Sequence, residues 1–115
     1  MKINEKLIGT INSYQMGTNG YIRFSNGLQI AWTEKYKSVA LQAWGNVFYA
    51  DVSDMPDWDA PFKNIYQQYV TCNNKQFWFA SDGATTTSPG SIRVLRATSG
   101  NHNIYIKAIA IGSWK

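Results

Sequence analysis

The stretch NGYIRFSNGLQIAW, residues 19–32, decides the fold class. It contains two short apolar runs, Tyr21–Phe24 and Leu28–Trp32, and the turn between them ends in Asn26-Gly27. Asn-Gly supplies the positive φ angles that a tight hairpin needs. In the second run the large apolar side chains recur at every other position, which is the period of a β-strand. This stretch therefore predicts an antiparallel β-hairpin.

The rest of the chain repeats this pattern of short apolar runs separated by turn residues, with no long helical stripe. Gly45-Asn46 is expected to join two of the later runs, and Asn73-Asn74-Lys75 to close a second hairpin. About eight short strands with regularly spaced turns are typical of a sandwich or barrel. We therefore expect an all-β fold, a small antiparallel β-sandwich. The six later predicted strands are Ser38–Leu41, Val47–Val52, Ile65–Cys72, Gln76–Ser81, Ile92–Ala97 and Ile104–Trp114.

The last predicted strand changes the face on which its isoleucines fall. Ile104 and Ile106 share one face, whereas Ile109 and Ile111 share the other. A β-bulge would explain the change, and so would burial on both faces, either in a central strand or in a contact between subunits.

The length of 115 residues predicts one domain that buries a core without covalent staples. We expect residues 19–115 to form the sandwich and residues 1–18 to be a lead-in or a connection to an upstream shaft. Aromatic residues make up 15% of the chain, including five Trp and seven Tyr. This is more aromatic surface than a small core needs, so we expect some rings at a subunit interface or a ligand site.

Several classes of partner are disfavoured by the sequence. The net charge is +4, but the eleven Lys and Arg are scattered rather than clustered, which argues against nucleic acid. No run approaches the roughly 18 apolar residues of a membrane span. The first residues, Met1–Glu5, contain no apolar core of a signal peptide, so we expect synthesis in a reducing cytoplasm.

Catalytic constellations are largely missing. The single His102 and the single Cys72 cannot supply the three or four ligands of a zinc site. No activating motif surrounds Cys72 to make it a nucleophile, and no phosphate-binding glycine-rich loop is present. We expect no enzyme, no metal and no cofactor.

The segment around Trp58 is the candidate ligand site. Pro56 and Pro61 predict a loop over residues 53–63, in which Trp58 stands between Asp57 and Asp59. An exposed indole can stack on the apolar face of a sugar while carboxylates accept its hydroxyl hydrogens. Tyr66 follows on the next predicted strand and completes the candidate set of Asp57, Trp58, Asp59 and Tyr66. In the alternative, Trp58 folds back and plugs the end of the sandwich.

Four of the seven acidic residues lie close together in sequence, at Asp51, Asp54, Asp57 and Asp59. Aspartate is common in turns because it bonds local backbone amides, and this is the favoured interpretation. Calcium binding and glycoside hydrolysis by paired carboxylates are the alternatives.

Three segments resemble the C-terminal, receptor-binding tip of phage and prophage tail-fibre proteins. They are Asn19–Trp32, the proline–phenylalanine step Pro61–Asn64, and the closing Ile109–Trp114, which reads IAIGSW. The outline of the domain is also similar to the sandwich of H-type lectins. The resemblance implies a trimeric component of a virion tail, made without a signal peptide, that contacts other tail proteins and adheres to a host-surface glycan or protein.

No binding residue of these families carries over, because the loops differ and no site motif matches. Two other functions remain open. One is a structural tail protein that caps or trimerises a fibre without touching the host, and the other is a glycan-cleaving tail enzyme.

Overall fold

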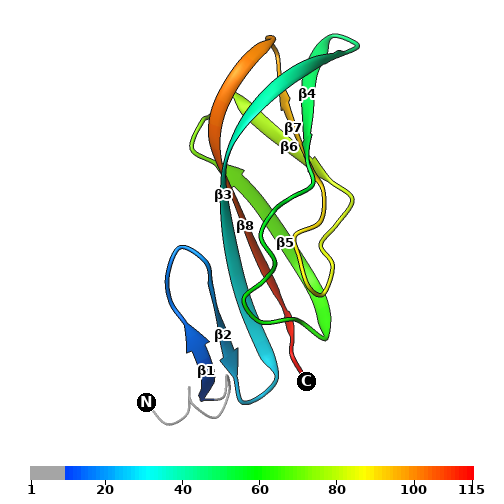
Figure 1. Ribbon diagram of the computed structural model, residues 1–115. Helices are drawn as coiled ribbons and strands as arrows, with labels where there is room; N and C mark the ends of the chain where they lie inside the picture. The colour runs from blue at the N-terminus through cyan, green and yellow to red at the C-terminus, as the bar shows by residue number, and fades with distance from the viewer. Residues whose placement is uncertain (1–9) are drawn as a thin grey trace.

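The computed structural model describes residues 10–115, and all of its regular structure is β-strand (Figure 1). None of these residues forms a helix of the length and apolarity that crossing a membrane requires. The strands are β1 (Ile11–Gln15), β2 (Gly20–Phe24), β3 (Leu28–Trp44), β4 (Val47–Val52), β5 (Asn64–Cys72), β6 (Phe77–Ser81), β7 (Ile92–Arg96) and β8 (Gly100–Ser113).

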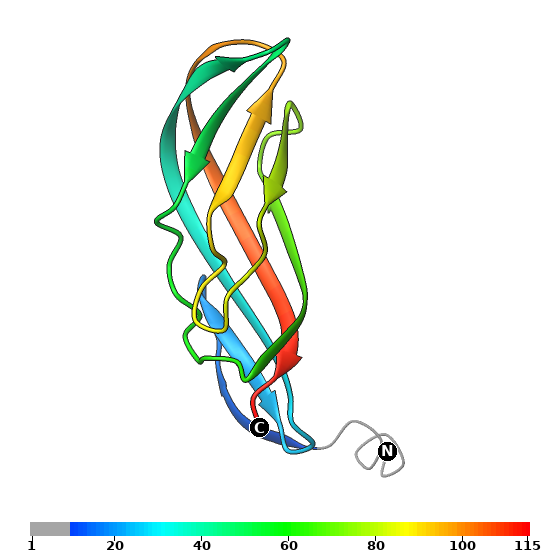
Figure 2. The same cartoon turned by 90° about the vertical axis from the view of Figure 1, so that its right-hand side faces the viewer.

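The strands form two antiparallel layers, which confirms the predicted sandwich. The five-stranded sheet has the order β1-β2-β3-β8-β5, and the four-stranded sheet has the order β3-β4-β7-β6. β3 belongs to both sheets, because its first part pairs with β8 and its last three residues pair with β4. The molecule is elongated, with extents of 53 × 22 × 21 Å, and β1 and the C terminus lie at one end (Figure 2).

Two predicted strands are one in the structure. Leu28–Trp32 and Ser38–Leu41 are parts of the 17-residue β3, which pairs with β8 without interruption from Leu28 opposite Ser113 to Leu41 opposite Gly100. The charged residues Glu34, Lys35 and Lys37 lie between the two predicted strands. They are tolerated because their charged ends reach solvent-side partners while the backbone continues the ladder.

Two of the predicted turns join paired strands in the structure, and a third does not. β2 and β3 form the expected hairpin at Asn26-Gly27, where Gly27 has a φ of 101°, and β3 and β4 are joined at Gly45 with a φ of 61°. The predicted hairpin across Asn73-Asn74-Lys75 is wrong. β5 pairs with β8 and β6 pairs with β7, so this connection carries the chain from one sheet to the other.

The N-terminal part predicted as a lead-in contributes a strand. β1 pairs with β2 at the edge of the five-stranded sheet, with a shift of register between Ile11 and Ser13. Residues 1–9, where the expected connection to a shaft would begin, lie outside the described residues.

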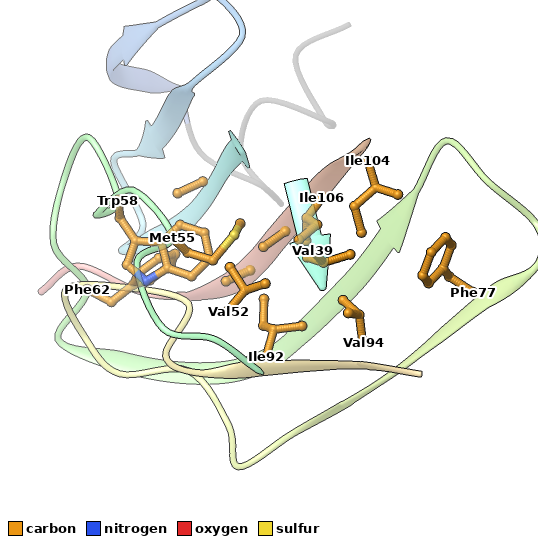
Figure 3. Close-up of a cluster of buried hydrophobic side chains, with 13 residues drawn as sticks. Val39, Val52, Met55, Trp58, Phe62, Phe77, Ile92, Val94, Ile104 and Ile106 are labelled. Atoms are coloured by element: carbon orange, nitrogen blue, oxygen red, sulfur yellow. The ribbon is translucent and has the colours of Figure 1, made fainter. Parts of the chain in front are cut away.

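The core lies between the two sheets and is completed by the loop that follows β4 (Figure 3). Ile104 and Ile106 of β8 face Val52 of β4 and the apolar residues of β7. At one end Met55, Trp58 and Phe62 turn inward from the irregular segment 53–63. The loop is pinned to the segment 82–91 by the backbone N–H groups of Trp58 and Phe62, which donate to Thr87 O and Thr86 O at 2.9 and 2.8 Å.

β8 keeps one alternation throughout, so the change of parity among its isoleucines has no bulge behind it. Ile104 and Ile106 face the core, and Ala108 and Ala110 take the next two inward positions. Ile109 and Ile111 therefore point to the outer face, where Ile109 remains 39% exposed. β8 is a central strand with apolar residues on both sides, which is one of the two arrangements that the sequence left open.

Candidate functional site

Trp58 does not take the role of an exposed ligand platform. Its side chain is only 4% exposed, its indole N–H donates to Thr85 O at 3.1 Å, and its ring meets Phe62 edge-on at 5.7 Å between centroids. The structure thus places Trp58 in the position of a plug, which was the alternative interpretation of the sequence. An indole with both its faces in the core has no surface left for a sugar.

The other three predicted site residues are on the surface but do not form one site with each other. Asp59 accepts a hydrogen bond from Gln15 Nε2 at 2.8 Å, which ties the loop to β1, and Asp57 is exposed. Tyr66 is 64% exposed and borders a shallow hollow with Gly27 and Lys115 at the C-terminal end of the molecule. Neither aspartate lines that hollow.

The acidic cluster is also dispersed. Asp54 bonds Lys37 Nζ at 2.8 Å and lies 3.3 Å from Lys35 Nζ, and these ammonium groups, Lys37 first, hold the pKa of its carboxyl below the usual range. Asp51 pairs instead with Arg93 on β7. Among residues 10–115, no three His, Cys, Asp or Glu side chains gather as a metal site would require.

The outer face of the five-stranded sheet carries an extended apolar surface, which we call the apolar face. It consists of Trp32, Tyr36, Tyr69, Tyr105 and Ile109. Trp32, Ile109 and Tyr69 lie side by side on β3, β8 and β5, while Tyr36 and Tyr105 are paired across β3 and β8 with ring centroids 4.6 Å apart. Four of the five are at least 39% exposed.

A hollow of about 460 Å³ lies within the apolar face, bordered by Trp32, Tyr69 and Ile109. Its charged members are Glu34 and Lys107, which occupy opposite positions on β3 and β8 and approach to 3.6 Å. The two charges are opposite and cancel, so the apolar face presents no net charge to a binding partner. A contiguous exposed apolar surface that includes three tyrosines is typical of an interaction site.

A second aromatic group lies on the outer face of the four-stranded sheet. The guanidinium of Arg93 is held by Asp51 through two bonds, from Nε to Oδ1 at 2.7 Å and from Nη2 to Oδ2 at 2.9 Å. Its carbon Cζ lies 4.7 Å from the ring centroid of Trp44 and 4.2 Å from that of Tyr49. The two rings meet edge-on at 5.7 Å, so the cation is clamped between aromatic side chains and a carboxylate.

This clamp borders a hollow of about 300 Å³, which we call the Trp44 hollow. Trp44 is 51% exposed, and the four-stranded sheet lies toward the end of the molecule opposite β1 (Figure 1). The hollow is lined by Trp44, Asp51, Ala80, Ser81, Asp82, Ser91 and Arg93.

The five tryptophans fall into two groups according to whether the indole N–H has an acceptor within the described residues. Trp32, Trp58 and Trp114 donate their indole N–H to the carbonyl oxygens of Gly17, Thr85 and Phe24. Within residues 10–115, the indole N–H groups of Trp44 and Trp78 find no acceptor, and both rings are exposed on the four-stranded sheet. These are the two tryptophans whose polar atom remains available to a ligand or to water.

The sequence did not single out the Trp44 hollow. Trp44 stands beside a predicted strand and outside the candidate set around Trp58, and Asp51 was grouped with the aspartates that follow it. The signal that would have located the hollow is the pairing of β4 with β7, which sets Asp51 opposite Arg93. That register joins residues 42 positions apart and cannot be derived from local turn chemistry.

No protein-family model and no curated protein sequence matches the chain. Its fold is nevertheless shared with solved structures of pyocin tail fibres. The R1 pyocin fibre of P. aeruginosa (C-terminal residues 323–701) has a TM-score of 0.64 at 15% identity over 87% of this chain. An N-truncated R1-type fibre scores 0.58 at 16% identity over 96%, and an N-truncated R2-type fibre scores 0.52 at 16% identity over 84%. This chain spans 27%, 94% and 36% of the three structures, and at such identities the likeness is one of fold.

Proposed function

We propose that this chain is a module of a phage tail fibre, or of a phage-tail-like particle, that adheres to a host surface. The observation that carries the proposal is the fold, which 84–96% of the chain shares with pyocin tail fibres. The sequence motifs at residues 19–32, 61–64 and 109–114 support it independently, because they resemble segments of tail-fibre tips. The host-surface ligand is a glycan or a protein, and the similarity to H-type lectins remains a prediction.

The module works as a homotrimer in which the apolar face of each subunit is buried against another subunit. Support comes from the exposed tyrosines of that face and from its lack of net charge, which lets identical copies meet without like-charge repulsion. Apolar aromatic surface of this kind is typical of subunit interfaces. The threefold symmetry itself, the contacts with other tail proteins and the location in a virion tail rest on the resemblance to tail fibres.

The module binds rather than catalyses. Glycoside hydrolysis needs two carboxylates that face one substrate across a cleft. Here Asp51, Asp54 and Asp59 accept hydrogen bonds from three different residues, Arg93, Lys37 and Gln15 respectively. Incubation with host polysaccharide is expected to release no new reducing ends.

Adhesion is tested with the fluorescently labelled protein on a panel of bacterial strains. Saturable binding to some strains, competed by the unlabelled protein or by extracted surface polysaccharide, is the expected result. Competition by polysaccharide identifies a glycan ligand, and its failure identifies a protein ligand. Three sites on one trimer strengthen weak individual binding by avidity, so the trimer should stay bound at dilutions at which a monomeric variant is released.

A second candidate function, a structural protein that trimerises or caps a fibre without touching the host, is favoured by the apolar face taken alone. Burial of that face accounts for assembly and requires no ligand. A protein that assembles fully and binds none of the strains supports this candidate and contradicts the adhesion proposal.

A further inference from the structure

We propose that the Trp44 hollow binds one pyranose-sized sugar unit that carries no negative charge. The inference rests on the proposed adhesion function and deepens it, because it assigns a site and a ligand class. A volume of about 300 Å³ lies at the lower end of the range for small-molecule sites, which suits a single sugar ring.

Stacking is supplied by Trp44. Arg93 packs against its indole at 4.7 Å, which fixes the orientation of the ring, and about half of the side chain stays in solvent. A rigid, exposed aromatic surface offers an apolar contact at low entropic cost, since two χ angles are already set. The axial C–H groups of a pyranose form the complementary apolar patch.

Polar groups surround this stacking surface. Asp51 and Asp82 can accept hydrogen bonds from sugar hydroxyls, while Ser81 and Ser91 can both donate and accept. Asp51 is also oriented by its two bonds to Arg93, so a ligand would meet a carboxylate that is already ordered. A few placed polar groups around an apolar surface are what a small-molecule site requires.

The charge of the lining selects against acidic sugars. Asp51 and Asp82 contribute two negative charges and Arg93 one positive charge, which leaves the lining at −1. The Nε and Nη2 donors of Arg93, which form the fork that would grip a ligand carboxylate, are already given to Asp51. Asp82 takes part in none of the ion pairs found among residues 10–115, so its charge adds repulsion against a uronic acid.

The test uses ¹H–¹⁵N correlation spectra, in which the five tryptophans give five separate indole signals. The probes are the methyl glycosides of glucose, galactose, mannose, rhamnose, glucosamine and glucuronic acid. We expect at least one neutral or amino glycoside to shift the Trp44 signal saturably and to leave the internally bonded Trp58 signal unchanged. The glucuronide is expected to bind roughly tenfold more weakly than the matching glucoside.

Single-residue variants test whether the sugar binds at the Trp44 hollow. Binding to the variants is followed by the backbone amide signals of Asp51 and Ser81, which line the hollow. Trp44→Ala should abolish the saturable shift of these signals, whereas Trp78→Ala, which removes a comparably exposed tryptophan of the same sheet outside the lining, should preserve it. Asp82→Asn should narrow the difference between glucoside and glucuronide. The proposal is overturned if no glycoside shifts the Trp44 signal, if Trp44→Ala binds as well as the wild type, or if the glucuronide binds most tightly.

The cell-binding assay separates this inference from the function on which it rests. If the wild type binds cells and Trp44→Ala binds them equally, the Trp44 hollow is overturned while adhesion stands. If the wild type binds no strain, the adhesion proposal itself fails.

Discussion

Trp58 stabilises the domain by closing the core where the loop 53–63 crosses its end. Replacing Trp58 by Ala removes a nearly fully buried ring, its edge contact with Phe62 and its bond to Thr85 O. We expect the free energy of unfolding to fall by about 3–5 kcal/mol, measured by urea denaturation. Trp78→Ala, at 45% exposure, is the matched control and should change it far less. Equal losses in the two variants would contradict the assigned burial.

The ion pair between Asp51 and Arg93 gives the stability a dependence on pH. The hydrogen bond from Arg93 lowers the pKa of the Asp51 carboxyl in the folded protein below its usual range. The stabilisation is therefore complete above the ordinary carboxyl pKa and disappears as the pH falls through the lowered value. Because the pair is partly exposed, the effect should be modest.

Urea midpoints of the wild type and Asp51→Asn, measured between pH 7 and pH 2, test this expectation. The wild type should be the more stable protein at pH 7, and the two curves should converge below about pH 4. A difference that persists unchanged to pH 2 would show that Asp51 acts through packing rather than through its charge.

At the level of single residues, the sequence indicated what a side chain can do better than where the side chain lies in the fold. It indicated that a loop tryptophan between aspartates either binds a ligand or plugs the core, and only the packing of Trp58 on Phe62 decides between the two. It offered no reason to prefer Trp44 over Trp78 or Trp114. Which side of a sheet a strand-end tryptophan occupies depends on pairing partners that lie far along the chain.

β8 organises the five-stranded sheet because β3 and β5 pair with its two edges. At its end Gly112 allows β5 to approach closely, since a Cβ there would lie 2.0 Å from Asn64 O and 2.9 Å from Phe62 Cδ1. Gly112→Ala must push the start of β5 and the core-closing loop outward. We expect a loss of about 1–3 kcal/mol or more in urea denaturation.

Gly17→Ala is the control for this substitution. Gly17 lies in the turn between β1 and β2, and an added Cβ would meet only Asn19 O at 3.3 Å. Its effect on the unfolding midpoint should be small. If Gly112→Ala is equally well tolerated, the close approach of β5 to β8 is not needed for the fold.

Local turn signals predicted elements well and non-local pairings poorly. Asn26-Gly27 and Gly45 end strands that pair with their sequence neighbours, and positive φ angles at the two glycines explain why the sequence reveals them. The turn at residues 73–75 looked similar but contains no glycine, and its flanking strands belong to different sheets. Whether two consecutive strands of a sandwich pair with each other or lie in different sheets depends on how the whole core packs. A short segment of sequence does not contain this information.

For the whole molecule, the two sheets divide the exposed aromatic residues into surfaces of different chemistry. The apolar face holds tyrosines, an isoleucine, the internally bonded Trp32 and the ion pair of Glu34 with Lys107. The Trp44 hollow instead combines an indole whose N–H is free of internal acceptors among residues 10–115 with the carboxylates of Asp51 and Asp82. The first surface suits burial against another protein chain and the second suits a polar ligand. Because the surfaces lie on different sheets, assembly through one leaves the other open.

The native mass in solution tests the role assigned to the apolar face. Light scattering coupled to size exclusion should give a mass near three times the 13.0 kDa of one chain. Ile109→Glu places a charge among Trp32 and Tyr69, where three copies would have to bury it unpaired, so this variant is expected to elute as a monomer with unchanged strand content by circular dichroism. Trp78→Glu, on the other sheet, should remain assembled. A wild type that is monomeric, or an Ile109→Glu variant that still trimerises, would remove the apolar face from the interface and leave it available for the host ligand.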